Sequence, residues 1–334
     1  MEGINQIVTD IKSGNIKPIY FLMGEESYYI DKISDYIEKN VLNEEEKSFN
    51  QMVLYGRDVS IDDIISNAKR FPMMAERQVV IVKEAQDLSR TIENLVSYAE
   101  NPQPSTVLVI CYKYKTLDKR KKLSKTIEKH GVLLESKKLY ENQVGDWIRR
   151  VLSGKSYTIE PKATLMLVEF LGTDLAKINN ELEKLLLILP QGSLITAAHI
   201  EENIGISKDF NNFELRKAVG ARQIVKANQI VNYFAQNPRS NPLVMTISLL
   251  NSFFTQLLIY HSLKNKSKGN VAKALRVNPY FVGDYDTAAR NYPMRKVSQT
   301  ISLLREADLK SKGVGATNMN QADILKELLF KMMH

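Results

Sequence analysis

The sequence has very little of the chemistry from which disulfides, metal centres and nucleophilic active sites are built. In 334 residues it contains one cysteine, one tryptophan and four histidines. The single cysteine, Cys111, excludes an intramolecular disulfide. It lies in the apolar run Val107–Cys111, so we expect it to be a buried thiol. This usage fits a reducing compartment, and we expect a cytoplasmic protein.

Metal sites, catalytic triads and membrane spans are not predicted either. None of the four histidines has a second ligand or a carboxylate at a spacing typical of zinc sites or triads. The N-terminus lacks the basic start and apolar stretch of a signal peptide. The most apolar region, residues 243–260, is interrupted by polar side chains such as Thr246 and Gln256. That pattern favours a core helix over a membrane span, and we expect no contact with a membrane.

A nucleotide-binding loop is missing at the end of the first predicted strand. That strand is followed by Gly24-Glu25-Glu26-Ser27, whereas a phosphate loop needs repeated glycines, a lysine and a serine or threonine that binds Mg²⁺. The later strands Val79–Val82 and Val107–Cys111 are not followed by an Asp-Glu pair that could activate water. We therefore expect no ATP binding, no cofactor and no intrinsic catalysis.

What the first 140 residues do contain is an alternation of strand-like and helix-like segments. Four short apolar runs are bounded by turn or charge signals, and the intervals between them leave room for crossover helices. These runs are Ile19–Met23, Val79–Val82, Val107–Cys111 and Val132–Leu134. The alternation predicts an α/β domain with a doubly wound parallel sheet over residues 1–140.

From Gln143 onward the strand signals stop and the pattern is helical. Pro161 suits the start of one helix and Gly172 its end, and Asp174 suits the cap of Leu175–Leu189. We predict a small helical domain over residues 141–207 and a larger one over residues 208–334. The larger domain should contain the helices Phe213–Val219, Gln223–Gln236, Pro242–Lys264, Val271–Leu275, Tyr280–Asn291, Met294–Lys312 and Gln321–Met333. The predicted fold class is thus α/β plus all-α.

The most informative segment is Phe71-Pro72-Met73-Met74, which joins an amphipathic helix to a buried strand. The helix is predicted from the apolar spacing of Ile61, Ile64, Ile65 and Ala68, with Ser60 and Asp62 as start signals and two basic residues, 69 and 70, at its C-terminal end. A junction of this kind is normally polar. The two methionines either fill a gap beneath the sheet or form an adaptable apolar surface for a partner, and we favour the second interpretation.

A second segment is strongly basic and runs from Lys113 to Lys122. The candidates for contacts with DNA phosphates are Lys113, Lys115, Lys119, Arg120, Lys121 and Lys122. The formal net charge of +8 is consistent with a nucleic-acid or acidic partner. A basic run is more often a solvated connection between a strand and a helix, and both interpretations stay open.

Three segments resemble the delta-subunit family of the bacterial DNA polymerase III clamp loader. Pro18–Asp31 is similar to the family's opening strand, acidic turn and aromatic-apolar helix. Pro72–Gln78 is similar to the family's two large apolar residues, small residue and Arg-Gln before a strand. Glu306–Gly313 resembles a segment near the family's C-terminus. The resemblance implies an AAA+-like domain over residues 1–140, a helical lid over 141–207 and an oligomerising collar over 208–334.

The resemblance also implies a function. Met73 and Met74 would enter an apolar pocket of the ring-shaped sliding clamp, with Phe71 and Pro72 shaping the approach. Family members often carry Leu-Phe there, so the Met pair keeps the apolar bulk and differs in shape. The implied role is to open the clamp for loading on primed DNA without hydrolysing ATP, as a non-catalytic subunit of an assembly with DNA-directed DNA polymerase activity. The implied partners are the sliding clamp (beta subunit), the other subunits of a hetero-oligomeric loader ring, and primed DNA.

Two other functions stay open from the residues alone. One is an AAA+-type ATPase that acts as a helicase loader, against which the missing phosphate loop argues. The other is a DNA-binding adaptor that works through residues 113–122, for which steep salt dependence of duplex binding without a clamp would be the signature.

Overall fold

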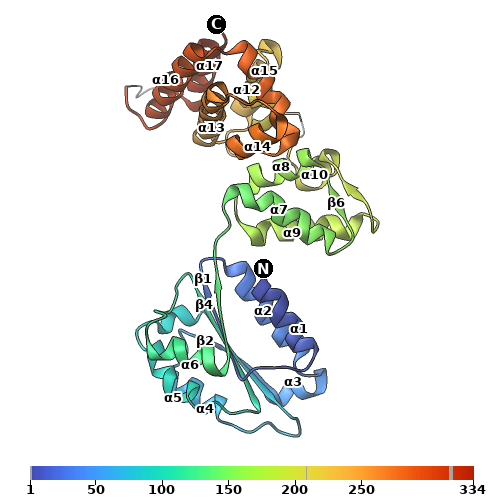
Figure 1. The fold of residues 1–334 in the computed structure, drawn as a ribbon, viewed down its shortest axis with the longest axis vertical. Coiled ribbons are helices and arrows are strands. Elements are labelled where there is room, and N and C mark those ends of the chain that lie inside the picture. Colours follow the sequence, from blue (N-terminus) through green and yellow to red (C-terminus); the bar gives the residue numbers. More distant parts are fainter. Residues whose placement is uncertain (1, 208, 316–318) are drawn as a thin grey trace. The chain divides into compact units, whose positions relative to one another are not determined.

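The computed structural model describes residues 2–207, 209–315 and 319–334 (Figure 1). The chain forms two compact units, Met1–Leu139 and Tyr140–His334. The first unit is α/β with a parallel sheet, and the second is almost entirely helical. The fold class predicted from the sequence is therefore confirmed. The division of the second unit into a lid and a collar stays a prediction.

The first unit is built around a five-stranded parallel sheet with the strand order β2-β3-β4-β1-β5. Four of its strands match the predicted runs: β1 (Ile19–Gly24), β3 (Gln78–Lys83), β4 (Thr106–Lys113) and β5 (Val132–Ser136). Strands β1, β3 and β4 are buried on both faces, which explains why their sequences are apolar without alternation. The edge strand β2 (Gln51–Tyr55) was not predicted, because its apolar run is short and directly follows a helix.

Helices cover both faces of this sheet (Figure 1). Helices α1 (Glu2–Lys12) and α2 (Ser27–Asn40) pack isoleucines against one face. The other face is covered by α4 (Ile61–Ala68), α6 (Lys122–His130) and the short helices of residues 85–99. Those short helices are η1 (Ala85–Leu88), η2 (Ile92–Leu95) and α5 (Val96–Ala99). A further helix, α3 (Glu44–Asn50), precedes the edge strand.

The second unit begins with four helices and one small sheet. The helices are α7 (Glu141–Ser153), α8 (Pro161–Leu171), α9 (Leu175–Ile188) and α10 (Ala197–Ile204). The carboxylate of Asp174 accepts the Lys177 N–H and caps α9, as predicted. The expectation that strands stop after Gln143 was wrong, because β6 (Thr158–Ile159) and β7 (Leu194–Ile195) form a parallel pair. Two-residue strands are too short to produce a period-two pattern in the sequence.

The remaining helices share one large apolar core. Each predicted helix is present, with ends that shift by a few residues and with the first turn of Tyr280–Asn291 tightened into a 3₁₀ helix. The elements are α11 (Asn212–Gly220), α12 (Ile224–Gln236), α13 (Leu243–Ser262), α14 (Lys268–Leu275), η3 (Pro279–Phe281), α15 (Val282–Asn291), α16 (Met294–Ser311) and α17 (Gln321–Met333).

Helix α13 is long and apolar enough to span a membrane by length and composition. Its side chains at Leu250, Phe254 and Leu257 lie in the core of the second unit, where they pack with residues of other helices. The sequence-based interpretation of this segment as a core helix is consistent with that packing.

Candidate functional site

The segment between α4 and β3 is an exposed loop. Phe71 and Met73 are 78% and 62% exposed, and Met74 is fully exposed at 104%. Pro72 between them is half-buried. The two methionines therefore do not fill a gap beneath the sheet, and that interpretation is wrong. Several large apolar side chains close together in solvent are typical of a surface that binds a partner.

The helix before this loop is fixed at both of its ends. At its start the Ser60 hydroxyl accepts the Asp63 N–H and the Asp63 carboxylate accepts the Ser60 N–H, at 3.2 and 2.9 Å. The Ser60 hydroxyl also donates to the Asp63 carboxylate at 2.7 Å, and this bond, together with the one from the Ser60 N–H, lowers the pKa of Asp63. Ser60 thus caps the helix, as the sequence predicted. At its end the Thr106 hydroxyl donates to the Ala68 carbonyl at 2.8 Å, and the Gln78 Nε2 donates to the Arg70 carbonyl at 2.6 Å. Carbonyls that lack partners within the helix are thereby satisfied.

The centre of the loop is held by Asn50, the last residue of α3. The Asn50 Oδ1 accepts the Met73 N–H at 2.6 Å, and the Asn50 Nδ2 donates to the Met73 carbonyl at 2.9 Å. The next residue, Met74, has a φ of 54°, a left-handed conformation that is uncommon for residues other than glycine. Sequence reasoning missed Asn50 because it lies 23 residues from its partner and belongs to no local pattern.

The six basic residues predicted for DNA contacts lie at the end of β4, in the connection that follows it and at the start of α6. Lys115 donates to the Ser89 hydroxyl at 2.7 Å. The other five each pair with carboxylates: Lys113 with Asp31 and Glu84, Lys119 with Glu135, Arg120 with Asp118, Lys121 with Glu93 and Lys122 with Glu100. The pairs of Lys119, Arg120, Lys121 and Lys122 are exposed, and exposed ion pairs are weak, so these four cations keep the capacity to meet phosphates. The Lys113 side chain is mostly buried between its two carboxylates. DNA contact by this run stays a prediction.

The turn after β1 is closed by hydrogen bonds within the chain. The Gly24 N–H donates to the Lys115 carbonyl and the Glu25 N–H to the Ser136 carbonyl, each at 3.0 Å. The Tyr28 N–H donates to the Glu26 carboxylate at 3.2 Å. In a phosphate loop such N–H groups point at the ligand, whereas here they already have acceptors.

An ion network lies at the carboxyl ends of the central strands, the edge where parallel α/β sheets commonly bind ligands. The Lys113 ammonium at the end of β4 lies 2.8 Å from carboxylate oxygens of both Asp31 and Glu84. Burial opposes the charge of Lys113, but its hydrogen bonds to these two carboxylates outweigh burial and raise its pKa. The same bond, together with one from Gln86, lowers the pKa of Glu84. Charged side chains of the chain itself therefore pair with one another at the edge where a ligand could bind.

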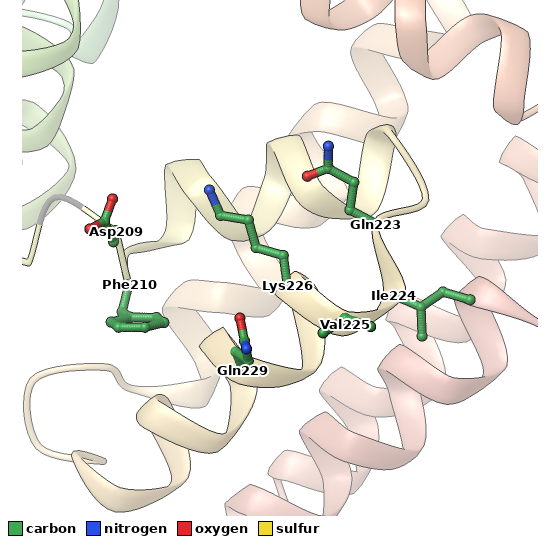
Figure 2. Close-up of a pocket in the computed structure, with 7 residues that line it drawn as sticks. All are labelled: Asp209, Phe210, Gln223, Ile224, Val225, Lys226 and Gln229. Atoms are coloured by element: carbon green, nitrogen blue, oxygen red, sulfur yellow. The ribbon is translucent and has the colours of Figure 1, made fainter.

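A cavity of about 510 Å³ lies in the second unit (Figure 2). Its lining comes from the start of α12 and from the segment before α11: Asp209, Phe210, Gln223, Ile224, Val225, Lys226 and Gln229. The Lys226 ammonium pairs with Glu214 at 2.9 Å. Within the described ranges no group of three or more His, Cys, Asp or Glu is placed to hold a metal ion.

Cys111, the one thiol of the chain, lies in the core of the first unit and is 1% exposed. Burial raises its pKa to about 11, so it is protonated at neutral pH. The expectation of a buried core thiol is confirmed.

Comparisons with known proteins agree over both units. The model of the family "DNA polymerase III, delta subunit" matches residues 20–137, and the model "DNA polymerase III delta subunit, C-terminal domain" matches residues 209–332. The Bacillus subtilis (strain 168) protein DNA polymerase III subunit delta is 27% identical over 328 residues, which cover 95% of this chain and 93% of the relative. The solved structure of the Bacillus subtilis DNA clamp loader delta protein is 26% identical, covers 99% of each chain and superposes with a TM-score of 0.56. The exposed loop lies inside the first matched range.

Proposed function

Because the chain belongs to the DNA polymerase III delta-subunit family, we propose that this clamp-loader subunit binds the ring-shaped sliding clamp through Phe71, Pro72, Met73 and Met74 and favours the open ring. It does so in a complex with the other loader subunits, which act on primed DNA. Residues 141–207 would form the lid of this subunit, and residues 208–334 the collar that joins the ring. The assembly would work in the cytoplasm.

The observation that carries the proposal is the exposure of the apolar loop on a fixed support. Phe71, Met73 and Met74 face solvent, while hydrogen bonds from Gln78, Thr106 and Asn50 hold the backbone around them. Burying one such side chain in a partner contributes about 1.5–3 kcal/mol before the costs of association. Two adjacent methionines can therefore supply a large part of the affinity for an apolar pocket.

Opening would follow from binding alone. A ligand shifts an equilibrium between two states only by the difference in its affinity for them. The subunit would favour the open ring because its docked loop fits the clamp better when the ring interface is parted. No chemical step by this chain is needed for that shift.

The absence of ATP hydrolysis by this chain is part of the proposal. It is supported by the turn after β1, where the N–H groups of Gly24 and Glu25 already have carbonyl acceptors. It is also supported by Glu25 and Glu26, because two carboxylates at this turn repel phosphate. Energy from ATP would enter through partner subunits that expose or withdraw the loop.

Equilibrium binding of the purified chain to its cognate sliding clamp tests the proposal. We expect wild-type protein to bind and Met73→Ala/Met74→Ala to bind at least about 100-fold more weakly, because two buried apolar side chains are lost. The matched control is Met294→Ala/Met319→Ala, which removes two exposed methionines of the second unit and should bind like wild type.

Melting curves of all three proteins should coincide, since these side chains contribute little to the core. Absence of wild-type binding would overturn the proposed function. Equal binding by Met73→Ala/Met74→Ala would keep the clamp as partner and move the docking site elsewhere.

A further inference from the structure

The loop of residues 71–74 is joined by hydrogen bonds to Asn50 of a second element, helix α3, and the residue before Asn50 is the exposed Phe49. We infer that Phe49 is part of the clamp-docking surface and that Asn50 is a positioning residue that holds Met73 and Met74 ready for binding. The inference rests on the proposed function for its partner. Its structural part, the role of Asn50 in the free protein, stands on the geometry of the chain alone.

Core packing does not explain Phe49. Helix α3 has the sequence Glu-Glu-Glu-Lys-Ser-Phe-Asn, so Phe49 is its only large apolar side chain. That side chain is 73% exposed. A helix that directs its one aromatic ring into solvent gains no burial from it in the free protein. Contact with a partner would supply that burial.

Asn50, the residue that follows Phe49 in α3, is bonded to the loop. Its side chain bonds both the N–H and the carbonyl of Met73, at 2.6 and 2.9 Å, and Phe49 is the adjacent residue in the chain. Asn50 itself is 5% exposed, and its Nδ2 also lies 3.2 Å from the Glu46 carbonyl of its own helix. The amide therefore ties the end of α3 to the centre of the loop. On this basis the inferred surface joins Phe49 to Phe71, Met73 and Met74.

The hydrogen bonds between Asn50 and Met73 also hold the loop in one conformation before a partner binds. Met74 is held at a φ of 54°, a conformation that a free loop of this sequence would rarely adopt. A loop that must be ordered during binding loses affinity to conformational entropy, and a loop ordered beforehand does not. By fixing Met73, the Asn50 amide keeps Met74 in a position where its whole side chain is available to the partner.

The surface also indicates the chemistry of its occupant. The exposed cations Lys69 and Arg70 lie immediately before Phe71 in the chain. A fitting partner therefore offers an apolar pocket for the methionines, room for an aromatic ring beside it, and acidic groups at the rim. The sliding clamp is the partner to which we assign this surface.

Two substitutions separate the two roles. Asn50→Ala should weaken clamp binding about tenfold, because the loop is no longer held before binding, and should speed hydrogen exchange of the Met73 amide about tenfold or more. Phe49→Ala should weaken binding about tenfold through lost contact, with the Met73 exchange rate unchanged.

The matched controls change side chains of the same kind elsewhere in the first unit. Asn40→Ala removes an amide that bonds the Tyr36 carbonyl at 2.8 Å within α2, and Tyr114→Ala removes another exposed aromatic ring. Both should bind the clamp like wild type. Phe49→Ala and both controls should melt with the wild-type protein, whereas Asn50→Ala should melt at a lower temperature because the Met73 N–H and carbonyl lose their partner. Binding is therefore compared at a temperature at which every variant is folded.

A double-mutant cycle distinguishes positioning from direct contact. In the Met73→Ala/Met74→Ala background, Asn50→Ala should cause no further loss of affinity, because the side chains that it positions are gone. Phe49→Ala should still weaken any residual binding. Equal effects of Asn50→Ala in both backgrounds would overturn its positioning role, and wild-type affinity of Phe49→Ala would remove that residue from the surface.

The failure of this inference and the failure of the proposed function give different results. If wild-type protein does not bind the clamp, the proposed function falls together with the partner assigned here. If Met73 exchanges as slowly in Asn50→Ala as in wild type, Asn50 does not hold the loop, whether or not the clamp binds.

Discussion

At the scale of single residues, Glu169 on α8 has a buried carboxyl group, and the charge of the nearby Arg216 only partly compensates for its burial. One of its carboxylate oxygens is buried without a hydrogen-bond partner. Burial raises the pKa of Glu169 from 4.5 to about 7, although the Arg216 guanidinium acts in the opposite direction. Between pH 4.5 and about pH 7, Glu169 therefore keeps its proton in the folded protein and releases it in the unfolded chain. The free energy of unfolding should therefore fall as the pH rises through this interval.

Glu169→Gln should abolish this part of the pH dependence, because the amide stays neutral. We expect the variant to be more stable than wild type at pH 8 and to lose the advantage near pH 5, where the wild-type carboxyl group is protonated in the fold. Urea unfolding at both pH values measures the difference. The control Glu202→Gln changes an exposed carboxylate of the same unit and should follow wild type at both. A Glu169→Gln protein with the wild-type slope would contradict this account.

The residues that could be predicted from the sequence are those whose role depends on near neighbours in the chain. Ser60 was predicted as a helix start from the residues after it, and Cys111 as a core thiol from the apolar run around it. Asn50 and Gln78 could not be predicted as anchors of the loop. Their partners lie 23 and 8 residues away, and an amide in the sequence carries no sign of the carbonyl that it will meet.

At the scale of elements, the junction between β1 and β5 depends on the absence of a side chain at Gly24. Gly24 has a φ of 123°, and a Cβ there would lie 2.1 Å from the Ser136 carbonyl oxygen of β5. Any larger residue must strain its own backbone and push the two strand ends apart. This glycine thus serves the packing of the sheet, in a turn where a nucleotide-binding protein would use glycines to approach phosphate.

Gly24→Ala should destabilise the first unit by about 2–3 kcal/mol, the sum of a strained conformation and a steric overlap. Gly269→Ala is the matched control, because Gly269 lies in α14 with open space around its Cα. That change should leave stability unaltered or raise it by about 0.4–1 kcal/mol. Chemical denaturation of both variants measures the contrast. Equal stability of Gly24→Ala and wild type would show that the strand ends can separate at little cost.

The elements that the sequence predicted best are those with long or fully buried patterns. The central strands β1, β3 and β4 are continuous apolar runs, and α17 (Gln321–Met333) was predicted to the residue. Strand β2 was not predicted from the sequence, because this edge strand is only partly buried and its apolar run is short. The exposed state of the loop after α4 also could not be decided, since the same methionines could have faced either the core or solvent.

At the scale of the whole molecule, the two units carry different parts of the proposed task. The exposed loop and the closed turn after β1 belong to Met1–Leu139, whereas Tyr140–His334 is helical and matches the family's C-terminal domain over residues 209–332. The sequence predicted this change of character from its loss of strand signals near Gln143. The division of the second unit into residues 141–207 and 208–334 stays a prediction.

Release of a sliding clamp from circular DNA tests the central claim, that this subunit opens the ring by binding alone. The clamp is loaded on nicked circular DNA, the loader is removed, and the purified chain is added without ATP while the clamp that stays on DNA is measured. We expect wild-type protein to release the clamp and Met73→Ala/Met74→Ala to leave it in place. If the clamp stays on the DNA although wild-type protein is bound to the clamp, opening by binding energy alone is contradicted.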